Sequence, residues 1–101
     1  MQTNDQILVL IAPVEMKDDL VDVLMEIDFI SGFSLSLIDG YSREHSHYDI
    51  NEQVEGYRKF YRFEVLHRQQ EQEKVLTSLK KDCSNGSVRY WILPVINEGR
   101  F

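Results

Sequence analysis

The polar segment 42–56, SREHSHYDINEQVEG, carries the residues with the clearest potential for chemistry. His45 and His47 are two positions apart, so in an extended chain their imidazoles point the same way and can reach one metal ion. Glu44, Asp49 or the same loop of a second copy can supply the remaining ligands. This set suits Zn(II), Cu(II) or Ni(II), whereas Cu(I) prefers cysteine and methionine ligands. The segment therefore predicts a metal site, with two solvated loop histidines as the alternative.

Arginines in the second half of the chain suggest an anion site. Arg58 and Arg62 belong to the densest basic cluster of the sequence, and Arg89 follows much later. Guanidinium groups bind carboxylates and phosphates through paired hydrogen bonds. Together with Gln53, they are our candidates for binding a small ligand at a cleft between subunits. The alternative is that these cations pair with acidic neighbours such as Glu64.

No catalytic signature is found in the sequence. It has no HExxH, no GxSxG and no Walker loop. Cys83 continues the apolar stripe of a predicted helix, so we expect it to pack against the sheet rather than act as a nucleophile. A binding or regulatory module is the leading interpretation. A small enzyme remains a second alternative, with an active site between subunits built from Arg58, Arg62 and loop carboxylates.

Composition and charge further limit the class of protein and its location in the cell. The chain has 101 residues, of which 43% are hydrophobic and 28% charged, which is typical of one folded domain (1–101). Its net charge of -6 argues against nucleic-acid binding. The single Cys83 cannot form an internal disulfide, and the apolar run 7–12 is too short for a membrane span or a signal-peptide core. We therefore expect a cytoplasmic protein that is not inserted in a membrane.

Hydrophobic patterns divide the chain into six elements. The run ILVLIA is apolar at every position, as in a strand buried on both faces, whereas FSLSL and FEV alternate between apolar and polar residues. Two segments repeat apolar residues with helical spacing. The predicted strands are residues 7–12, 33–41, 57–67 and 87–96, and the predicted helices are residues 15–28 and 69–82.

The order β-α-β-β-α-β predicts an α+β, ferredoxin-like fold with a core spanning about residues 7–96. In this fold two helices cover one face of a four-stranded antiparallel sheet. Because strands 7–12 and 87–96 carry apolar residues toward both faces, the uncovered face needs a partner, and we expect oligomerisation. The loop 42–56 is far longer than a hairpin needs, and Gly56 is predicted to be its hinge.

Several short features together resemble the PII-like superfamily, which includes GlnB and CutA. They are Ile11-Ala12-Pro13 before a helix, Gly32-Phe33 opening a strand, the long loop 42–56, and the closing run WILPV at residues 91–95. The chain resembles most an uncharacterised branch whose genes lie beside heavy-metal efflux pumps of the resistance-nodulation-division type. The resemblance implies a PII-like homotrimer with its open sheet faces turned inward, clefts between subunits, and a loop that signals to a target.

One departure from the PII pattern bears on the ligand. PII proteins clamp nucleotide phosphates with a turn rich in glycine and lysine after the second helix. Here the turn 83–87, CSNGS, has one glycine and no basic residue, which argues against a nucleotide. Lys80, Lys81 and Arg89 lie near the turn and could replace the missing cations, or could simply be solvated.

The sequence thus predicts a non-enzymatic regulatory protein. It would bind a small ligand or metal ion at the loop 42–56 and the clefts between subunits, and would signal to a protein partner, such as a heavy-metal efflux component. The mechanism would be an order-disorder change of the loop. The main alternative is a CutA-like metal-binding or metal-tolerance protein that acts without a signalling partner.

Overall fold

Apolar alternation and two helical repeats divide the chain into the expected elements. The computed structural model describes residues 4–41 and 57–101. Its strands are β1 (Asp5–Pro13), β2 (Phe33–Gly40), β3 (Arg58–Arg68) and β4 (Arg89–Pro94). Its α-helices are α1 (Lys17–Glu26) and α3 (Gln72–Lys80), each preceded by one 3₁₀ turn, Val14–Met16 and Gln69–Glu71. In the part of the chain described, no helix combines the length and the apolar character needed to cross a membrane.

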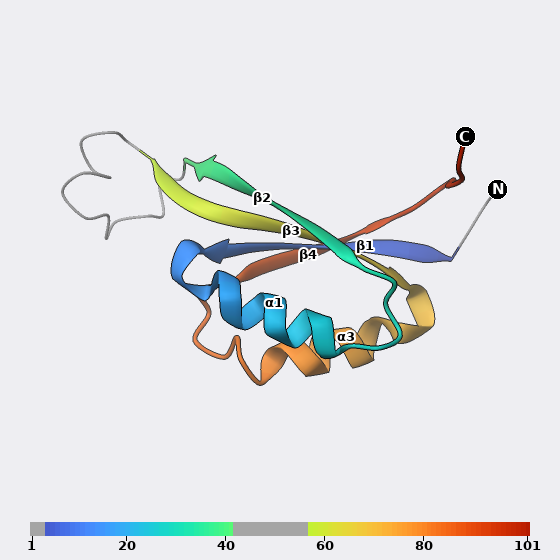
Figure 1. Cartoon of the computed structure of the whole chain (residues 1–101), viewed down its shortest axis with the longest axis horizontal. Coiled ribbons are helices and arrows are strands. Elements are labelled where there is room, and N and C mark those ends of the chain that lie inside the picture. Colours follow the sequence, from blue (N-terminus) through green and yellow to red (C-terminus); the bar gives the residue numbers. More distant parts are fainter. Residues whose placement is uncertain (1–3, 42–56) are drawn as a thin grey trace.

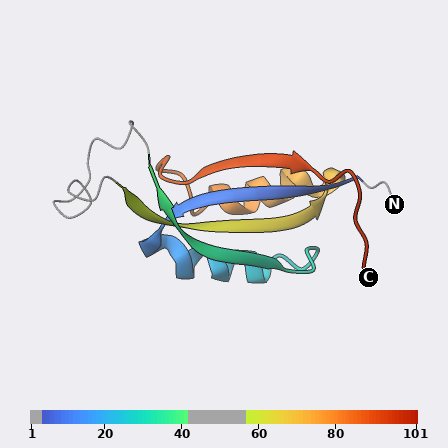
Figure 2. The same cartoon turned by 90° about the horizontal axis from the view of Figure 1, so that it is seen from above.

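The four strands form one antiparallel sheet in the order β2-β3-β1-β4. Both helices pack on the same face of this sheet, and the opposite face carries no helix (Figures 1 and 2). The ferredoxin-like prediction is therefore confirmed.

Both predicted helices and the last predicted strand are too long: α3 was expected to reach residue 82 but ends at Lys80, and β4 was expected to reach residue 96 but ends at Pro94. Helix α1 was expected to reach residue 28 but ends at Glu26, because Ile27 takes an extended backbone (ψ 101°) and its N–H reaches back to the Leu24 carbonyl at 3.2 Å. This exit directs the Ile27 side chain into the core, where it is buried. Strand β4 was expected to start at residue 87 but starts at Arg89, because the backbone N–H of Ser87 is bonded to the Asn85 side chain of the preceding turn and not to a neighbouring strand.

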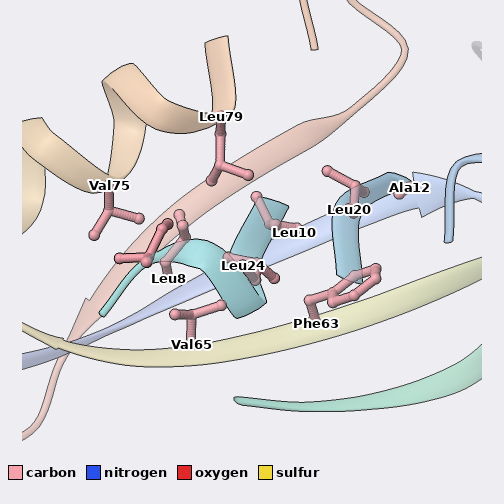
Figure 3. Packing of buried hydrophobic residues seen from close by; sticks show 10 residues of the cluster. Leu8, Leu10, Ala12, Leu20, Leu24, Phe63, Val65, Val75 and Leu79 are labelled. Atoms are coloured by element: carbon pink, nitrogen blue, oxygen red, sulfur yellow. The ribbon is translucent and has the colours of Figure 1, made fainter. Parts of the chain in front are cut away.

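The core lies between the helices and the sheet. Alternate strand residues point toward the helices, and the helical stripes meet them (Figure 3). Its fully or nearly fully buried members are Leu8, Leu10, Ala12, Leu20, Leu24, Ile27, Phe63, Val65, Val75 and Leu79. Cys83 is partly buried against this cluster, as its place in the apolar stripe predicted.

The other face of the sheet is also apolar. The register pairs Leu8 with Val65 and Ile92 on the helix side, so the neighbouring positions point to the open side. Ile7 pairs there with Leu93 and Leu66. The open face therefore presents a hydrophobic strip along β1 and the edge strand β4, bordered on β3 by Arg62 and Glu64, which agrees with the prediction that β1 is apolar toward both sides.

Val9 is the most buried residue of this open face. It lies between Trp91 and Glu64 in the register and is 0% exposed, although no helix covers it. Leu93 and Leu66 on the same face are 44% and 37% exposed. Part of the strip is thus covered by its own neighbours and part is open to a partner.

Candidate functional site

Four chain segments meet at one end of the sheet. β1 and β2 finish there, and β3 and β4 begin there, on the side away from the described chain ends (Figure 1). The register brings together Ile11 with Arg89, Pro13 with Phe60, and Gly40 with Arg58. Side chains far apart in the sequence therefore gather at this end, and all three of these strand pairs point to the open face.

These segments enclose a cavity of about 500 Å³. Its volume is in the range of small-molecule sites. Its lining residues come from β1 and the turn after it, the end of β2, the start of β3, and the turn before β4. They are Ile11, Pro13, Glu15, Met16, Gly40, Tyr41, Arg58, Phe60, Asn85, Gly86, Ser87 and Arg89. We call this cavity the strand-end cleft.

Arg58 supplies one positive charge to the strand-end cleft. Its Nη2 lies 3.8 Å from Glu15 Oε1, and its guanidinium carbon lies 5.5 Å from the centre of the Phe60 ring. Phe60 is buried, and its ring in turn requires Gly40, since a Cβ at that position would lie 2.6 Å from two ring carbons. Gly40 on β2 therefore leaves space for the Phe60 ring on β3, and the Arg58 guanidinium lies over that ring.

Arg89 supplies the second positive charge from β4. Its guanidinium carbon lies 5.8 Å from the centre of the Trp91 ring, two residues along the same strand. Within residues 4–41 and 57–101, no carboxylate lies at ion-pair distance from Arg89. Its charge is thus available to a bound anion.

The turn before β4 is closed by its own hydrogen bonds. Gly86 has φ 78°, a left-handed conformation that glycine adopts without strain. The Asn85 side-chain oxygen accepts the Ser87 N–H at 3.0 Å and the Ser87 hydroxyl at 2.6 Å. A phosphate would need such donors free. The geometry therefore adds to the sequence argument against a nucleotide clamped by this turn.

The structure brings together only some of the predicted ligand-binding residues. Arg58 and Arg89 share the strand-end cleft, whereas Arg62 does not line it. Arg62 Nε instead lies 3.4 Å from Glu64 Oε1, which is the pairing given above as the alternative. The other candidate residues predicted from the sequence lie outside the described residues: Gln53, Gly56, His45, His47, Glu44 and Asp49.

Potential metal ligands do not cluster in the part of the chain that the structure describes. Across the described ranges 4–41 and 57–101, no three histidine, cysteine or acidic residues come together as a metal site. His67, given no role from the sequence, is buried and contacts the Gln6 Oε1 atom at 3.1 Å and the Val65 carbonyl at 3.2 Å. We assign it to structure. The predicted metal site on the loop lies outside the described residues.

Cys83 lies beside a second, smaller cavity of about 190 Å³ between α3 and β4. Most of that lining is apolar, with Leu76, Leu79 and Val88 as neighbours. Burial raises the pKa of the Cys83 thiol, and the adjacent Asp82 carboxylate raises it further. Both effects favour the neutral thiol over the reactive thiolate.

Sequence reasoning missed Glu15 and Phe60 as members of the site. Glu15 was predicted only as the first residue of the helix 15–28, and Phe60 only as a residue of the strand 57–67. Phe60 lies two residues after Arg58 on β3 and so shares its face, whereas the register of β1 with β3 brings Glu15 beside Arg58. The signal that could have located them is the position of Pro13, since the end of an antiparallel strand must face the start of its partner.

Comparison with known proteins agrees with the fold. A crystal structure of a DUF3240 family protein from Shewanella baltica OS155 is 42% identical, with a TM-score of 0.80 and 98% of each chain covered. Arabidopsis thaliana PII bound to citrate is 15% identical with a TM-score of 0.72, covering 97% of this chain and 81% of that one. CutA of Archaeoglobus fulgidus, a periplasmic divalent cation tolerance protein, is 12% identical with a TM-score of 0.72, covering 95% and 88%.

The PII and CutA similarities establish the fold that these proteins share with this chain. No curated protein matches the sequence. The family model described as "Protein of unknown function (DUF3240)" matches residues 2–101, nearly the whole chain. The chain therefore belongs to the DUF3240 family and has the ferredoxin-like fold of PII and CutA.

Proposed function

We propose that the protein is a non-enzymatic, PII-like sensor that binds a small anionic ligand in the strand-end cleft. Binding is signalled to a protein partner through the loop 42–56. The observation that carries this proposal is the meeting of Arg58 and Arg89 in one cavity, from strands β3 and β4. Two guanidinium groups above apolar walls suit an organic acid.

The position of the cleft supports a link to the loop. Gly40 and Tyr41 immediately precede residues 42–56, Arg58 lies just after them, and all three line the cleft. The Tyr41 and Tyr57 rings, at the two ends of the segment, lie 5.6 Å apart. A ligand on Arg58 would therefore act directly on the base of the loop.

The open sheet face supports assembly into a homotrimer. Its hydrophobic strip points away from both helices, and burying such a strip is the usual driving force for association. The strand-end cleft opens toward the same face. In the proposed trimer it would lie at a boundary between subunits, where a neighbouring copy could add to its walls. The single cysteine fits the cytoplasmic placement expected from the sequence.

The proposed mechanism is a shift in the population of loop states. A ligand can move this equilibrium only by its difference in affinity for the two states. A ligand held by Arg58 and Arg89 that also contacts Tyr41, the residue before the loop, would give such a difference, because that third contact depends on the position of the loop base.

The ligand can be found by thermal shift across a panel of small organic acids, followed by calorimetry. We expect binding that is lost in the double variant Arg58→Gln/Arg89→Gln. Arg62→Gln is the matched control, since it removes the same charge from an arginine paired with Glu64 outside the cleft. Binding that survives in the double variant, or that is lost equally in the control, would contradict the proposed site.

Metal sensing is the other form of this proposal. His45 and His47, with Glu44 or Asp49, would hold Zn(II), Cu(II) or Ni(II), and the partner would be a heavy-metal efflux component. A CutA-like tolerance protein would bind the metal with the same residues but would act without a signalling partner. CutA shares the fold of this chain and is a divalent cation tolerance protein, and this similarity supports the metal-binding alternative.

Calorimetric titration of metal-free protein with each of the three ions tests this form. We expect micromolar or tighter binding that disappears in His45→Ala/His47→Ala. If binding is equally tight in the double variant, the metal site lies elsewhere. Capture experiments with the metal-loaded protein then separate a sensor, which retains a partner, from a tolerance protein, which does not.

A further inference from the structure

Glu15 is the acidic side chain among the described lining residues of the strand-end cleft, and its contact with Arg58 is weak. Glu15 Oε1 lies 3.8 Å from Arg58 Nη2, beyond hydrogen-bond distance. The two side chains are 67% and 33% exposed, and such solvated pairs contribute little to stability. A ligand can therefore displace Glu15 from Arg58 at small cost, but the carboxylate remains at the cleft.

The other cations of this region are already paired. Lys59 Nζ lies 2.8 Å from Asp39 Oδ1, and Arg62 is paired with Glu64. In the cleft itself, Arg58 is partly neutralised by Glu15, and Arg89 keeps its full charge. Among the lining residues that the structure describes, two guanidinium groups and one carboxylate give a formal charge of one positive unit.

We propose that Glu15 makes the cleft selective for a compact organic monoanion, such as a monocarboxylate with an apolar or aromatic body. This inference rests on the proposed function and names the ligand class of the same site. A monoanion matches the formal charge, and Ile11, Pro13 and Phe60 supply apolar walls for its body. A ligand with two or more negative charges places an additional charge beside Glu15, and the turn before β4 offers it no cation.

The test compares benzoate with phthalate, which have the same ring and one or two carboxylates. Calorimetry is done on the full chain of the wild type, Glu15→Gln and Glu26→Gln. Glu26, the last residue of α1, lies outside the cleft and provides the same change of charge as a control. We expect the wild type to prefer benzoate. Glu15→Gln should raise the ratio of phthalate to benzoate affinity about threefold or more, and Glu26→Gln should leave it unchanged.

The outcomes separate this inference from the proposed function. Binding that depends on Arg58 and Arg89, with an unchanged ratio in Glu15→Gln, overturns the selective role of Glu15 and leaves the anion site standing. An equal change in Glu26→Gln does the same, because it shows a general charge effect. Failure of both probes to bind the wild type, or binding that persists in Arg58→Gln/Arg89→Gln, overturns the anion site itself.

Discussion

Gly40 is the residue whose small size the cleft needs most. Its φ is not positive, so the requirement is for space rather than conformation. A Cβ at this position would lie 2.6 Å from Cδ2 and Cε2 of Phe60, whose ring is buried and cannot move aside freely. Gly40 on β2 thus leaves the space that the Phe60 ring on β3 occupies in the cleft.

Gly40→Ala should therefore lower the free energy of unfolding by about 1–3 kcal/mol, the usual cost of overpacking. Gly32→Ala is the matched control, because its Cβ would have no atom within 4 Å. Urea unfolding of the two variants gives the comparison. Equal stability of Gly40→Ala and Gly32→Ala would show that the Phe60 ring yields at no cost.

Cys83 gives a prediction on pH. Since burial raises its pKa above the ordinary 9.0, the folded state favours the neutral thiol, and this stability is lost as pH rises through the folded-state pKa. Alkylation by iodoacetamide should be slower than for an exposed cysteine at pH 8 and accelerate only at higher pH. Cys83→Ala should show a smaller loss of unfolding free energy above pH 9 than the wild type. A reaction as fast as that of a free thiol at pH 8 would contradict the assignment.

At the scale of elements, α1 is held to the sheet by its buried stripe. Leu24 is 1% exposed against the sheet, whereas the next residue, Met25, is 71% exposed. Leu24→Ala should lower the free energy of unfolding by about 2–5 kcal/mol. Met25→Ala should change it by less than about 0.5 kcal/mol. Chemical denaturation measures both, and a similar cost for the two would mean that α1 does not pack as described.

The sequence was sufficient for these elements because their periodicity is strong. Tyr61, Phe63 and Val65 alternate with charged residues, and this pattern alone fixes which side of β3 faces the helices. The helix end was missed at Ile27, since an apolar residue at helical spacing can also leave the helix to reach the core. Local pattern cannot separate these two cases, because the decision is made by packing.

The site was less accessible to sequence reasoning. Arg58 and Arg89 were both predicted as ligand-binding residues, but their meeting in one cavity depends on two strand registers that link distant segments. Glu15 was missed for the same reason. Arg62 was grouped with Arg58 by proximity in sequence, yet its side chain pairs with Glu64. Neighbouring positions in a sequence are a weak guide to a site assembled from four strand ends.

At the scale of the whole molecule, the open sheet face makes a prediction about assembly. Leu93 is 44% exposed in the hydrophobic strip, and a charge there would be buried by any partner subunit. Leu93→Glu should convert the assembled protein to monomers that remain folded. Met25→Glu, on the helical side, should leave the assembly unchanged. Sedimentation equilibrium gives the masses, and a monomeric wild type or an assembled Leu93→Glu would contradict the interface.

The most direct test of the proposed sensor is hydrogen–deuterium exchange of residues 42–56, with and without an acid that binds in the strand-end cleft. The account predicts slower exchange in this segment when the ligand is bound, and no change in Arg58→Gln/Arg89→Gln at the same ligand concentration. A ligand that binds through both arginines but leaves the exchange of residues 42–56 unaltered would contradict it, because occupation of the cleft would then not be transmitted to the loop.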